Sequence, residues 1–407
     1  MQILNLTISN HKSIKDEAPL DLTHATLHTL NPPRGTQWDD HLHHVAGIYG
    51  PNGSGKTNLL EALRHVQSAI ATLLPLGANA LPYMPYDVSK PTVYSVEFIH
   101  DGARYEYALS RNTEGIAGES LRVARKRWNT IYSRDKHGAV KGLKGLPHVN
   151  VNELVITRAS LMGDPQVKPV RDALTTGVKV FRVGDPSMED AYLHIARHLL
   201  SRRLDTTALS TLAQVADLGT TSIELCAPQR PALSARHAPA DREDAEVALA
   251  KALPHILEFQ YGERTVPHAA FSASSGSIMW LALAIAAVDA LTGGQVLVVD
   301  DLTASLHPDL GRVIIDWFTS PTANQSGAQL IFTSHDIALM DIGRGPIRNR
   351  ERIWFTEKNS AGATTLYQLS EFTGLQSGSN ITKNYLEGRF GATPYTCPSL
   401  IHHLLAD

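Results

Sequence analysis

Four residues at fixed spacing give the strongest chemical signal in the sequence. Gly50, Gly55, Lys56 and Thr57 fit the pattern G-x-x-x-x-G-K-[ST]. In such a loop the glycines let backbone N–H groups close around a phosphate, the lysine reaches the outer phosphates, and the threonine hydroxyl binds Mg²⁺. Apolar residues recur at helical spacing from Leu59 onward, so a helix should begin at the loop and point its positive end at the phosphates. An ordinary glycine turn that caps a helix is the alternative, and downstream residues decide between the two.

Two acidic residues end an apolar run further along the chain. Residues 296–299 are apolar and precede Asp300 and Asp301. Such a run is typical of a strand buried on both faces of a parallel sheet, and ligands bind at the carboxyl ends of these strands. We expect Asp300 to hold Mg²⁺ through water and Asp301 to orient an attacking water. A second apolar run, residues 329–333, ends near His335.

A cluster of small residues precedes the most apolar predicted helix. Ser274, Ser275, Gly276 and Ser277 lie directly before the apolar residues 278–288. Hydroxyls and free N–H groups at a helix N-terminus bind anions. The ordinary alternative is a serine that caps a buried helix.

Composition limits the classes of protein that the chain can form. It has 407 residues, is 43% hydrophobic, and carries a net charge of -3 from 37 basic and 40 acidic residues. Attraction to nucleic acid or to a membrane surface would therefore need a local patch. The two cysteines, Cys226 and Cys397, lack metal-ligand spacing, and the N-terminus has no signal-peptide pattern. The longest apolar run is shorter than the ~20 residues of a membrane span. We expect a cytoplasmic protein that does not enter a membrane.

The remaining elements are predicted from periodicity and composition. Alternation predicts strands and a β-hairpin, helical spacing predicts two amphipathic helices, and proline-rich segments predict loops. These are strands at residues 2–8 and 45–49, a hairpin over 94–109 with its turn at Asp101 and Gly102, helices over 189–204 and 209–215, and loops over 75–91 and 226–246.

A basic stretch lies beside a tryptophan. Residues 121–128 predict a strand that ends in Arg125, Lys126, Arg127 and Trp128. Cations beside an aromatic ring could contact a phosphate backbone. We favour a simpler interpretation, in which the charges keep a solvated sheet edge from aggregating.

The order of these parts resembles that of the SMC-like ABC ATPases. Within them it resembles the compact AAA-type ATP/GTP phosphatase proteins related to RloA and to the ATPase half of the overcoming-lysogenization-defect nucleases. The matching segments are residues 10–13 (the N-x-[KR]-S opening), 50–57 (Walker A), 274–277 (signature loop), 296–301 (Walker B), 304–308 (D-loop) and 333–336 (switch histidine).

The resemblance implies an α/β fold, that of an ABC/SMC-head P-loop ATPase with a mixed β-sheet core and an inserted α+β lobe. The core would comprise residues 1–71 and 271–407. The lobe would comprise residues 72–270, with a β-hairpin region at 92–132 and a helical region at 189–255.

The resemblance also implies ATP and Mg²⁺ as cofactors and assigns residues to them. Catalysis would use Lys56, Asp301 and His335, and the metal would be held by Thr57 and Asp300. The nucleotide would be held by Lys12, Ser13, Asn52, Gly53, Ser54, Gly55, Lys56, Thr57, Asn58, Ser274, Ser275, Gly276 and Ser277.

Three departures from the family pattern concern the rate of hydrolysis. Asp301 stands where the family usually has glutamate, and Ala273 stands where it often has glutamate. No glutamine lies between Leu73 and Lys90, where the family has its Q-loop. We expect ATP to bind and to be hydrolysed slowly.

The predicted function is that of a nucleotide-driven switch. Two copies would close head to head on ATP and control an effector protein encoded nearby, as in anti-phage or toxin-antitoxin-like systems. A DNA-binding repair ATPase is one alternative, although no heptad run persists through residues 72–270. A ribonuclease toxin that rests on Arg230 and His237 is another, and binding to nucleic acid stays possible.

Overall fold

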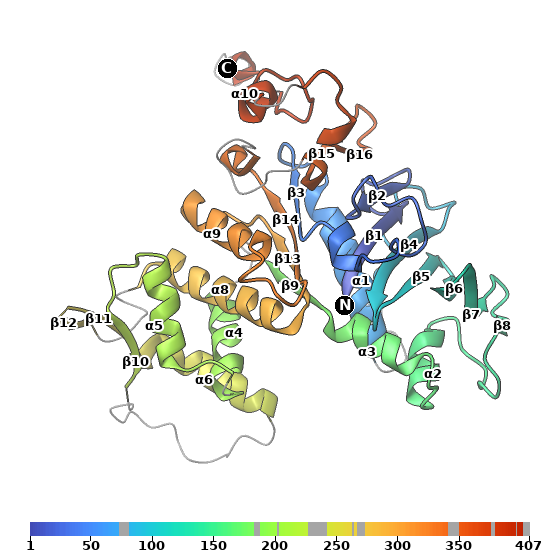
Figure 1. Ribbon diagram of the computed structural model, residues 1–407, viewed down its shortest axis with the longest axis horizontal. Coiled ribbons are helices and arrows are strands. Elements are labelled where there is room, and N and C mark those ends of the chain that lie inside the picture. The colour runs from blue at the N-terminus through green and yellow to red at the C-terminus, as the bar shows by residue number, and fades with distance from the viewer. Residues whose placement is uncertain are drawn as a thin grey trace.

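The computed structural model describes most of the chain. The description covers residues 1–72, 81–182, 188–201, 203–226, 242–262, 264–266, 273–340, 350–375, 379–395 and 397–401. These residues form two large β-sheets and a third, small sheet, with helices packed around them (Figure 1). The predicted α/β class and mixed sheet are confirmed.

The core sheet is mostly parallel and has the strand order β16-β15-β3-β14-β13-β9. Its strands are β3 (Val45–Tyr49), β9 (Val178–Arg182), β13 (Val296–Asp300), β14 (Gln329–Ser334), β15 (Ile353–Lys358) and β16 (Thr364–Gln368). Neighbours run parallel except β15 and β16. Because β14 lies between β3 and β13, the segments that follow these three strands meet at one edge of the sheet.

Alternate side chains of the core strands enter two separate hydrophobic clusters. Val45 and Tyr49 of β3 pack in the cluster that contains helices α8 (Ser275–Gly293) and α9 (Pro308–Thr319). Ala46 and Ile48 pack in the cluster that contains helix α1 (Lys56–Ala71). Burial on both faces explains why these strands are continuous apolar runs in the sequence.

Helix α8 is the most apolar helix of the described chain. By length and composition it could cross a membrane, with a mean hydropathy of 1.6 over its most apolar window, and 61% of that window is buried inside the protein. The Ser274 side chain caps its N-terminus by accepting from the Ser277 N–H at 3.1 Å. It ends at Gly294, which has a left-handed φ of 60°.

The second large sheet is antiparallel, with the order β2-β1-β4-β5-β6-β7-β8. Its strands are β1 (Gln2–Ser9), β2 (Ala18–Asp21), β4 (Thr92–His100), β5 (Ala103–Asn112), β6 (Gly115–Ala124), β7 (Trp128–Arg134) and β8 (Val140–Lys141). The predicted hairpin is confirmed as β4 and β5. Its turn residues Asp101 and Gly102 both have positive φ, 49° and 73°, as a tight two-residue hairpin requires.

The prediction that residues 121–128 form a charged edge strand is wrong. Strand β6 ends at Ala124, residues 125–127 form a turn, and Trp128 begins β7. Both β5 and β7 pair with β6, so β6 lies inside the sheet. The three cations of residues 125–127 therefore occupy an exposed hairpin turn.

A group of helices and a small sheet lie on the far side of α8 from the antiparallel sheet (Figure 1). Their elements are α4 (Met188–Leu200), α5 (Thr206–Val215), α6 (Arg242–Ile256), β10 (Ser222–Leu225), β11 (Leu257–Tyr261) and β12 (Arg264–Val266). Both predicted amphipathic helices are confirmed as α4 and α5. Of the predicted loop 226–246, residues 227–241 lie outside the described chain, and its end is wrong because α6 begins at Arg242.

Shorter elements complete the described chain. These are α2 (Val155–Leu161), α3 (Lys168–Thr176), α10 (Ile381–Leu386), and the 3-10 helices η1 (Trp38–His41), η2 (Ile337–Met340), η3 (Arg350–Arg352), η4 (Leu369–Glu371) and η5 (Pro398–Ile401). Residues 81–91 of the predicted loop 75–91 contain no helix or strand, and residues 75–80 lie outside the described chain.

The division into a core and an inserted lobe stays a prediction. Segment 72–270 contributes β4, which pairs with β1, and β9, which pairs with β13. It therefore supplies strands to both large sheets as well as the helical group.

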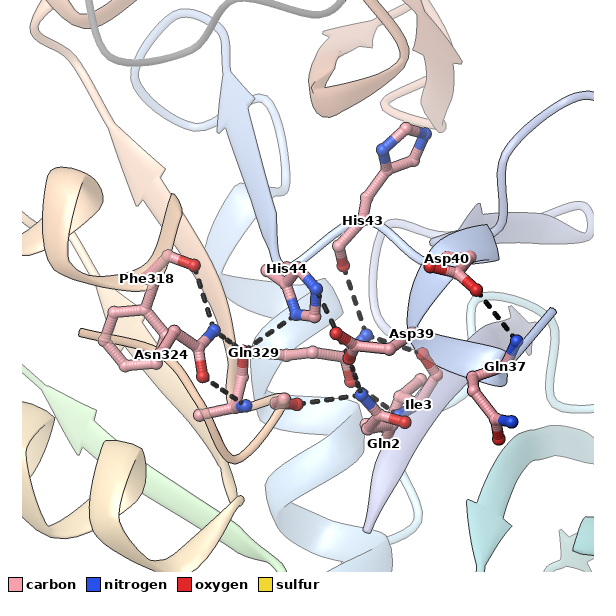
Figure 2. A network of polar contacts seen from close by, with 12 residues as sticks. Gln2, Ile3, Gln37, Asp39, Asp40, His43, His44, Phe318, Asn324 and Gln329 are labelled. Atoms are coloured by element: carbon pink, nitrogen blue, oxygen red, sulfur yellow. Dashed lines mark hydrogen bonds and ion pairs between the residues drawn. The ribbon is translucent and has the colours of Figure 1, made fainter. Parts of the chain in front are cut away.

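A buried glutamine joins the two large sheets (Figure 2). Gln329, at the start of β14, is 1% exposed. Its side-chain oxygen accepts from the backbone N–H of Ile3 at 2.6 Å, and its amide nitrogen donates to the carbonyls of Ile3 at 2.9 Å and His43 at 3.2 Å. One side chain thus pairs backbone groups of β1 and of the segment that leads into β3.

We predict that Gln329→Met destabilises the protein by about 1–3 kcal/mol, because methionine keeps the length of the side chain but leaves these buried backbone groups without their partners. The measurement is urea unfolding. Gln325→Met is the matched control, since the Gln325 side chain is exposed and its hydrogen bond to Thr322 is local. Equal midpoints for the two variants would contradict the joining role.

Candidate nucleotide-binding site

The phosphate-type loop lies between β3 and α1. Gly55, at the N-terminus of α1, has a φ of 109°, and Gly50 has a φ of 153°. A Cβ at Gly50 would lie 2.4 Å from the carbonyl oxygen of Thr356, and a Cβ at Gly55 would lie 2.3 Å from the hydroxyl of Thr364. Both positions need glycine because the loop rests directly on β15 and β16.

A chain of hydroxyl groups supports the loop from behind. The Ser54 and Thr356 hydroxyls are 2.6 Å apart, and the Thr364 hydroxyl donates to the Ser54 carbonyl at 2.7 Å. The Ser13 hydroxyl lies 2.7 Å from that of Thr364 and accepts from the Asn58 amide at 2.7 Å. Ser13 and Ser54 are buried, so their side chains brace the loop and do not line the cavity in front of it.

A cavity of about 710 Å³ opens in front of the loop. It is lined by loop residues and by the carboxyl ends of the neighbouring strands, which contribute most of the residues predicted for nucleotide, metal and catalysis. The lining residues are Asn52, Gly53, Gly55, Lys56, Thr57, Asn58, Asp300, Asp301, Ala304, Ser305, Thr333, His335 and Lys358.

Asp300 is held by two threonine hydroxyls. Thr57 donates to its two carboxylate oxygens at 3.1 and 3.0 Å, and Thr333 donates to Oδ1 at 2.8 Å. The Thr333 hydroxyl also accepts from the backbone N–H of Asp301 at 2.7 Å. A hydroxyl and a carboxylate at this separation supply the oxygen ligands that Mg²⁺ prefers, with bound phosphate and water completing its shell.

Asp301 faces the same cavity from a left-handed backbone conformation, with a φ of 56°. Burial raises the pKa of its carboxyl above the ordinary value, and Asp300 raises it further, whereas the charges of His335 and Lys56 act in the opposite direction. A carboxyl with a raised pKa in a phosphate site is suited to accept a proton from water.

Lys56 and His335 are the basic partners of this pair of acids. The Lys56 ammonium donates to the carbonyls of Gly50 at 2.7 Å and Pro51 at 3.0 Å. Burial lowers the pKa of Lys56 to about 8, while Asp301 and Asp300 act to raise it. Burial also lowers the pKa of His335, and the charge of Lys56 adds to this effect.

Lys12 does not line the cavity. Its ammonium forms an ion pair with Glu61 of α1, and its backbone is left-handed, with a φ of 48°. The structure therefore places Lys12 against the flank of α1.

The predicted signature residues lie apart from the phosphate loop. Ser274, Gly276 and Ser277 line a second cavity of about 550 Å³, and Ser275 is exposed beside it. The rest of this cavity is formed by Val215, Ala216, Asp217, Leu218, Ser305, Leu306, His307, Asp309, Leu310 and Val313. Ser305 lines both cavities, so the two cavities are neighbours within one chain.

Four residues that line the first cavity had no site role predicted from the sequence, namely Ala304, Ser305, Thr333 and Lys358. Thr333 connects Asp300 to the backbone of Asp301, and Lys358 adds a second lysine at the end of β15. Thr333 lies two residues before His335, and this short spacing could have suggested that Thr333 belongs to the site. Nothing local marks Lys358, because its position follows from β15 pairing with β3.

The family model described as "AAA domain, putative AbiEii toxin, Type IV TA system" matches residues 45–341. Among curated proteins there is no match.

Several solved structures are similar in shape. The SMC head domain from Thermotoga maritima is 12% identical with a TM-score of 0.43, covering 90% of this chain and 99% of that one. A dimeric post-hydrolysis state of the ATP-binding cassette MJ0796, bound to ADP and Pi, is 13% identical with a TM-score of 0.31, covering 89% and 98%. The ABC transporter component cbiO1 from Clostridium perfringens is 11% identical with a TM-score of 0.30, covering 100% of both chains.

We predict that ATP affinity falls as the pH rises through about 8, since the charged form of Lys56 attracts phosphates and its pKa in the free protein is about 8. At pH 9 roughly one-tenth of this lysine would stay protonated, so the Kd for ATP should be about tenfold higher than at pH 7. Isothermal titration calorimetry at the two pH values measures this.

Lys56→Arg is the control, because arginine stays charged over this range and should abolish the pH dependence. Lys56→Ala should lose ATP binding and keep its fold. The same pH dependence in Lys56→Arg would show that another group titrates.

Proposed function

The chain belongs to the AAA family described as "AAA domain, putative AbiEii toxin, Type IV TA system", and from this membership we propose that it acts as an ATP-driven switch. By family and fold it is a P-loop ATPase of the ABC and SMC-like kind. The supporting observation is the cavity that brings Lys56, Thr57, Asp300 and Asp301 together, although Lys56 and Asp300 lie 244 positions apart in the chain.

Each group in the cavity has a role in this proposal. Backbone N–H groups of the loop and the Lys56 ammonium bind the phosphates. Mg²⁺, held by Thr57 and through water by Asp300, stabilises the charge on the phosphates when it is bound. Asp301 orients and deprotonates the attacking water, and His335 contacts the outer phosphate from the end of β14.

Ser13, Ser54 and Lys12 act on the nucleotide indirectly. The hydroxyls of Ser13 and Ser54 hold the loop against β15 and β16. The ion pair of Lys12 with Glu61 holds the first turn after β1 against α1. The backbone N–H of Ser54 donates to the Pro51 carbonyl at 3.2 Å, so it too shapes the loop.

The ATP-bound form is a head-to-head homodimer in this proposal. Within one chain, Ser274, Gly276 and Ser277 line a cavity separate from the phosphate loop. A second copy would bring its helix N-terminus and these small residues to the open side of the bound phosphates, where N–H and hydroxyl donors are favourable.

The output of the switch is contact with an effector protein. The family description names a Type IV toxin-antitoxin system, which favours a partner encoded nearby, in a cytoplasmic anti-phage or toxin-antitoxin-like setting. The resemblance to RloA and to the ATPase half of the overcoming-lysogenization-defect nucleases leads to the same proposal. The ribonuclease alternative rested on Arg230 and His237, which lie outside the described residues.

We predict that Ser275→Arg still binds ATP as a monomer but does not dimerise, because a large exposed cation would stand between the two copies. Sedimentation velocity with a non-hydrolysable ATP analogue tests this. Ser275 is preferred to Gly276, since a Cβ at Gly276 would lie 2.8 Å from the carbonyl of Ser305 and would disturb the single chain. Ala139→Arg, in the exposed β7–β8 turn, is the control and should dimerise. A dimer of Ser275→Arg would refute the head-to-head arrangement.

We predict that Asp301→Asn binds ATP and stays in the closed dimer, because the amide keeps the shape of the side chain but cannot accept a proton. Steady-state turnover per ATP-binding molecule should fall at least about 100-fold. The trapped dimer is also the form with which an effector should co-purify, in contrast to Lys56→Ala. Turnover equal to that of the unaltered protein would move the catalytic role to His335.

A further inference from the structure

The segment around the last two strands of the antiparallel sheet carries an excess of positive charge. Residues 121–148 contain eight lysines and arginines and one acid, Asp135, a net charge of about +7 by count. The whole chain carries -3. Because the whole chain is slightly negative, attraction to nucleic acid or to a membrane surface would need a local positive patch of this kind.

Most of these cations are free to meet a ligand. Arg134 is buried and donates to the carbonyls of Glu153 at 2.8 Å and Asn150 at 3.0 Å, and Arg122 forms an ion pair with Glu106. The other six are exposed, and no ion pair joins them to an acid within the described residues. They are Arg125, Lys126, Arg127, Lys136, Lys141 and Lys144, which we call the β7 basic surface.

The one acid of this stretch, Asp135, already accepts hydrogen bonds from backbone N–H groups. Asp135 is exposed, and its carboxylate accepts from the N–H groups of His137 at 2.9 Å and Ala139 at 3.1 Å. These hydrogen bonds shape the β7–β8 turn and lower the pKa of Asp135. They do not remove its charge, so Asp135 partly offsets the nearby Lys141.

The six cations surround strand β7 and the free edge of the sheet. Residues 125–127 form the turn before β7, and Lys136 lies in the turn after it. Lys141 lies on β8. The next residue, Gly142, packs so closely on β7 that an added Cβ would lie 2.2 Å from the carbonyl oxygen of Ile131. The segment that leads to Lys144 therefore begins beside β7. This edge lies on the opposite side of the molecule from α5 and β10–β12 (Figure 1).

The turn before β7 is held in place. The Arg125 N–H donates to the Arg127 carbonyl at 3.0 Å, and the side chains of Asn31 and Asn129 donate to the carbonyls of Arg125 at 2.6 Å and Arg127 at 2.7 Å. The Arg122 guanidinium packs over the Trp128 ring, with its central carbon 4.8 Å from the centre of the ring. A turn fixed in this way loses little conformational freedom when its side chains bind.

We propose that the β7 basic surface binds the phosphate backbone of double-stranded nucleic acid. Strand β7 has seven residues and spans about 20 Å, and this length of duplex axis carries roughly twelve phosphates. No large apolar side chain is exposed within residues 121–148, all of which are described. Protein interfaces have apolar and aromatic centres, whereas nucleic-acid interfaces are polar and basic, so nucleic acid is favoured over an acidic protein.

The experiment is a binding titration of the full chain with fluorescein-labelled DNA duplexes of about 24 base pairs, followed by anisotropy over a range of salt concentrations. Two unrelated sequences should bind alike, because phosphate contacts carry no sequence information. R125A/K126A/R127A should weaken binding about 10- to 100-fold at low salt and reduce the slope of log K against log salt by about 2 to 3.

The control variant K168A/K251A/K383A removes the same charge from exposed lysines elsewhere and should leave both quantities nearly unchanged. R125A/K126A/R127A should bind ATP like the unaltered protein, because these residues do not line the cavity in front of the phosphate loop, so failure of this proposal leaves the ATP switch untouched. Absence of binding, or equal losses in the two triple variants, would overturn the proposal. So would polyglutamate that competes as well as the duplex, which would indicate an acidic protein partner.

Discussion

The nucleotide cavity depends on one carboxylate shared by two hydroxyl groups. Asp300 ends β13, and the hydroxyls that bind it come from Thr57 at the start of α1 and Thr333 near the end of β14. The three segments are neighbours because β14 lies between β3 and β13. These hydrogen bonds hold Asp300 close to Asp301 in a partly buried space, where the two like charges oppose each other.

Strand β14 connects this cavity to the rest of the protein. Thr333, near its carboxyl end, positions Asp300 and the backbone of Asp301, while Gln329, at its other end, binds backbone groups of β1 and of the segment before β3. Beneath the phosphate loop, Ser13, which follows β1, reaches Thr364. The antiparallel sheet is therefore joined to the nucleotide core at both ends of β1, by buried polar contacts that have few alternative arrangements.

The sequence predicted what is local and missed what depends on pairing. The phosphate loop, the acids after β13 and the apolar strands were predicted because each occupies a short segment with its own chemistry. The cations of residues 125–127 were wrongly predicted to lie on an edge strand, because the sequence pattern of a strand does not show how many neighbouring strands it pairs with. The position of Lys358 and the join of β9 to β13 depend on contacts between segments more than 100 positions apart, which periodicity does not encode. The start of α6 at Arg242 was missed because the alanine, proline and charge before it hid the helical segment.

The departure at position 301 has a physical reason in the backbone. Asp301 has a φ of 56°, and among residues with a side chain, aspartate and asparagine adopt this left-handed conformation with the least strain. Its N–H is fixed by the Thr333 hydroxyl, so the backbone cannot relax without disturbing Asp300 as well. A longer glutamate would reach about 1.5 Å further toward the phosphates but would add strain at the same position. Side-chain length and backbone conformation are therefore coupled at this position, because a longer side chain gains reach only by adding backbone strain.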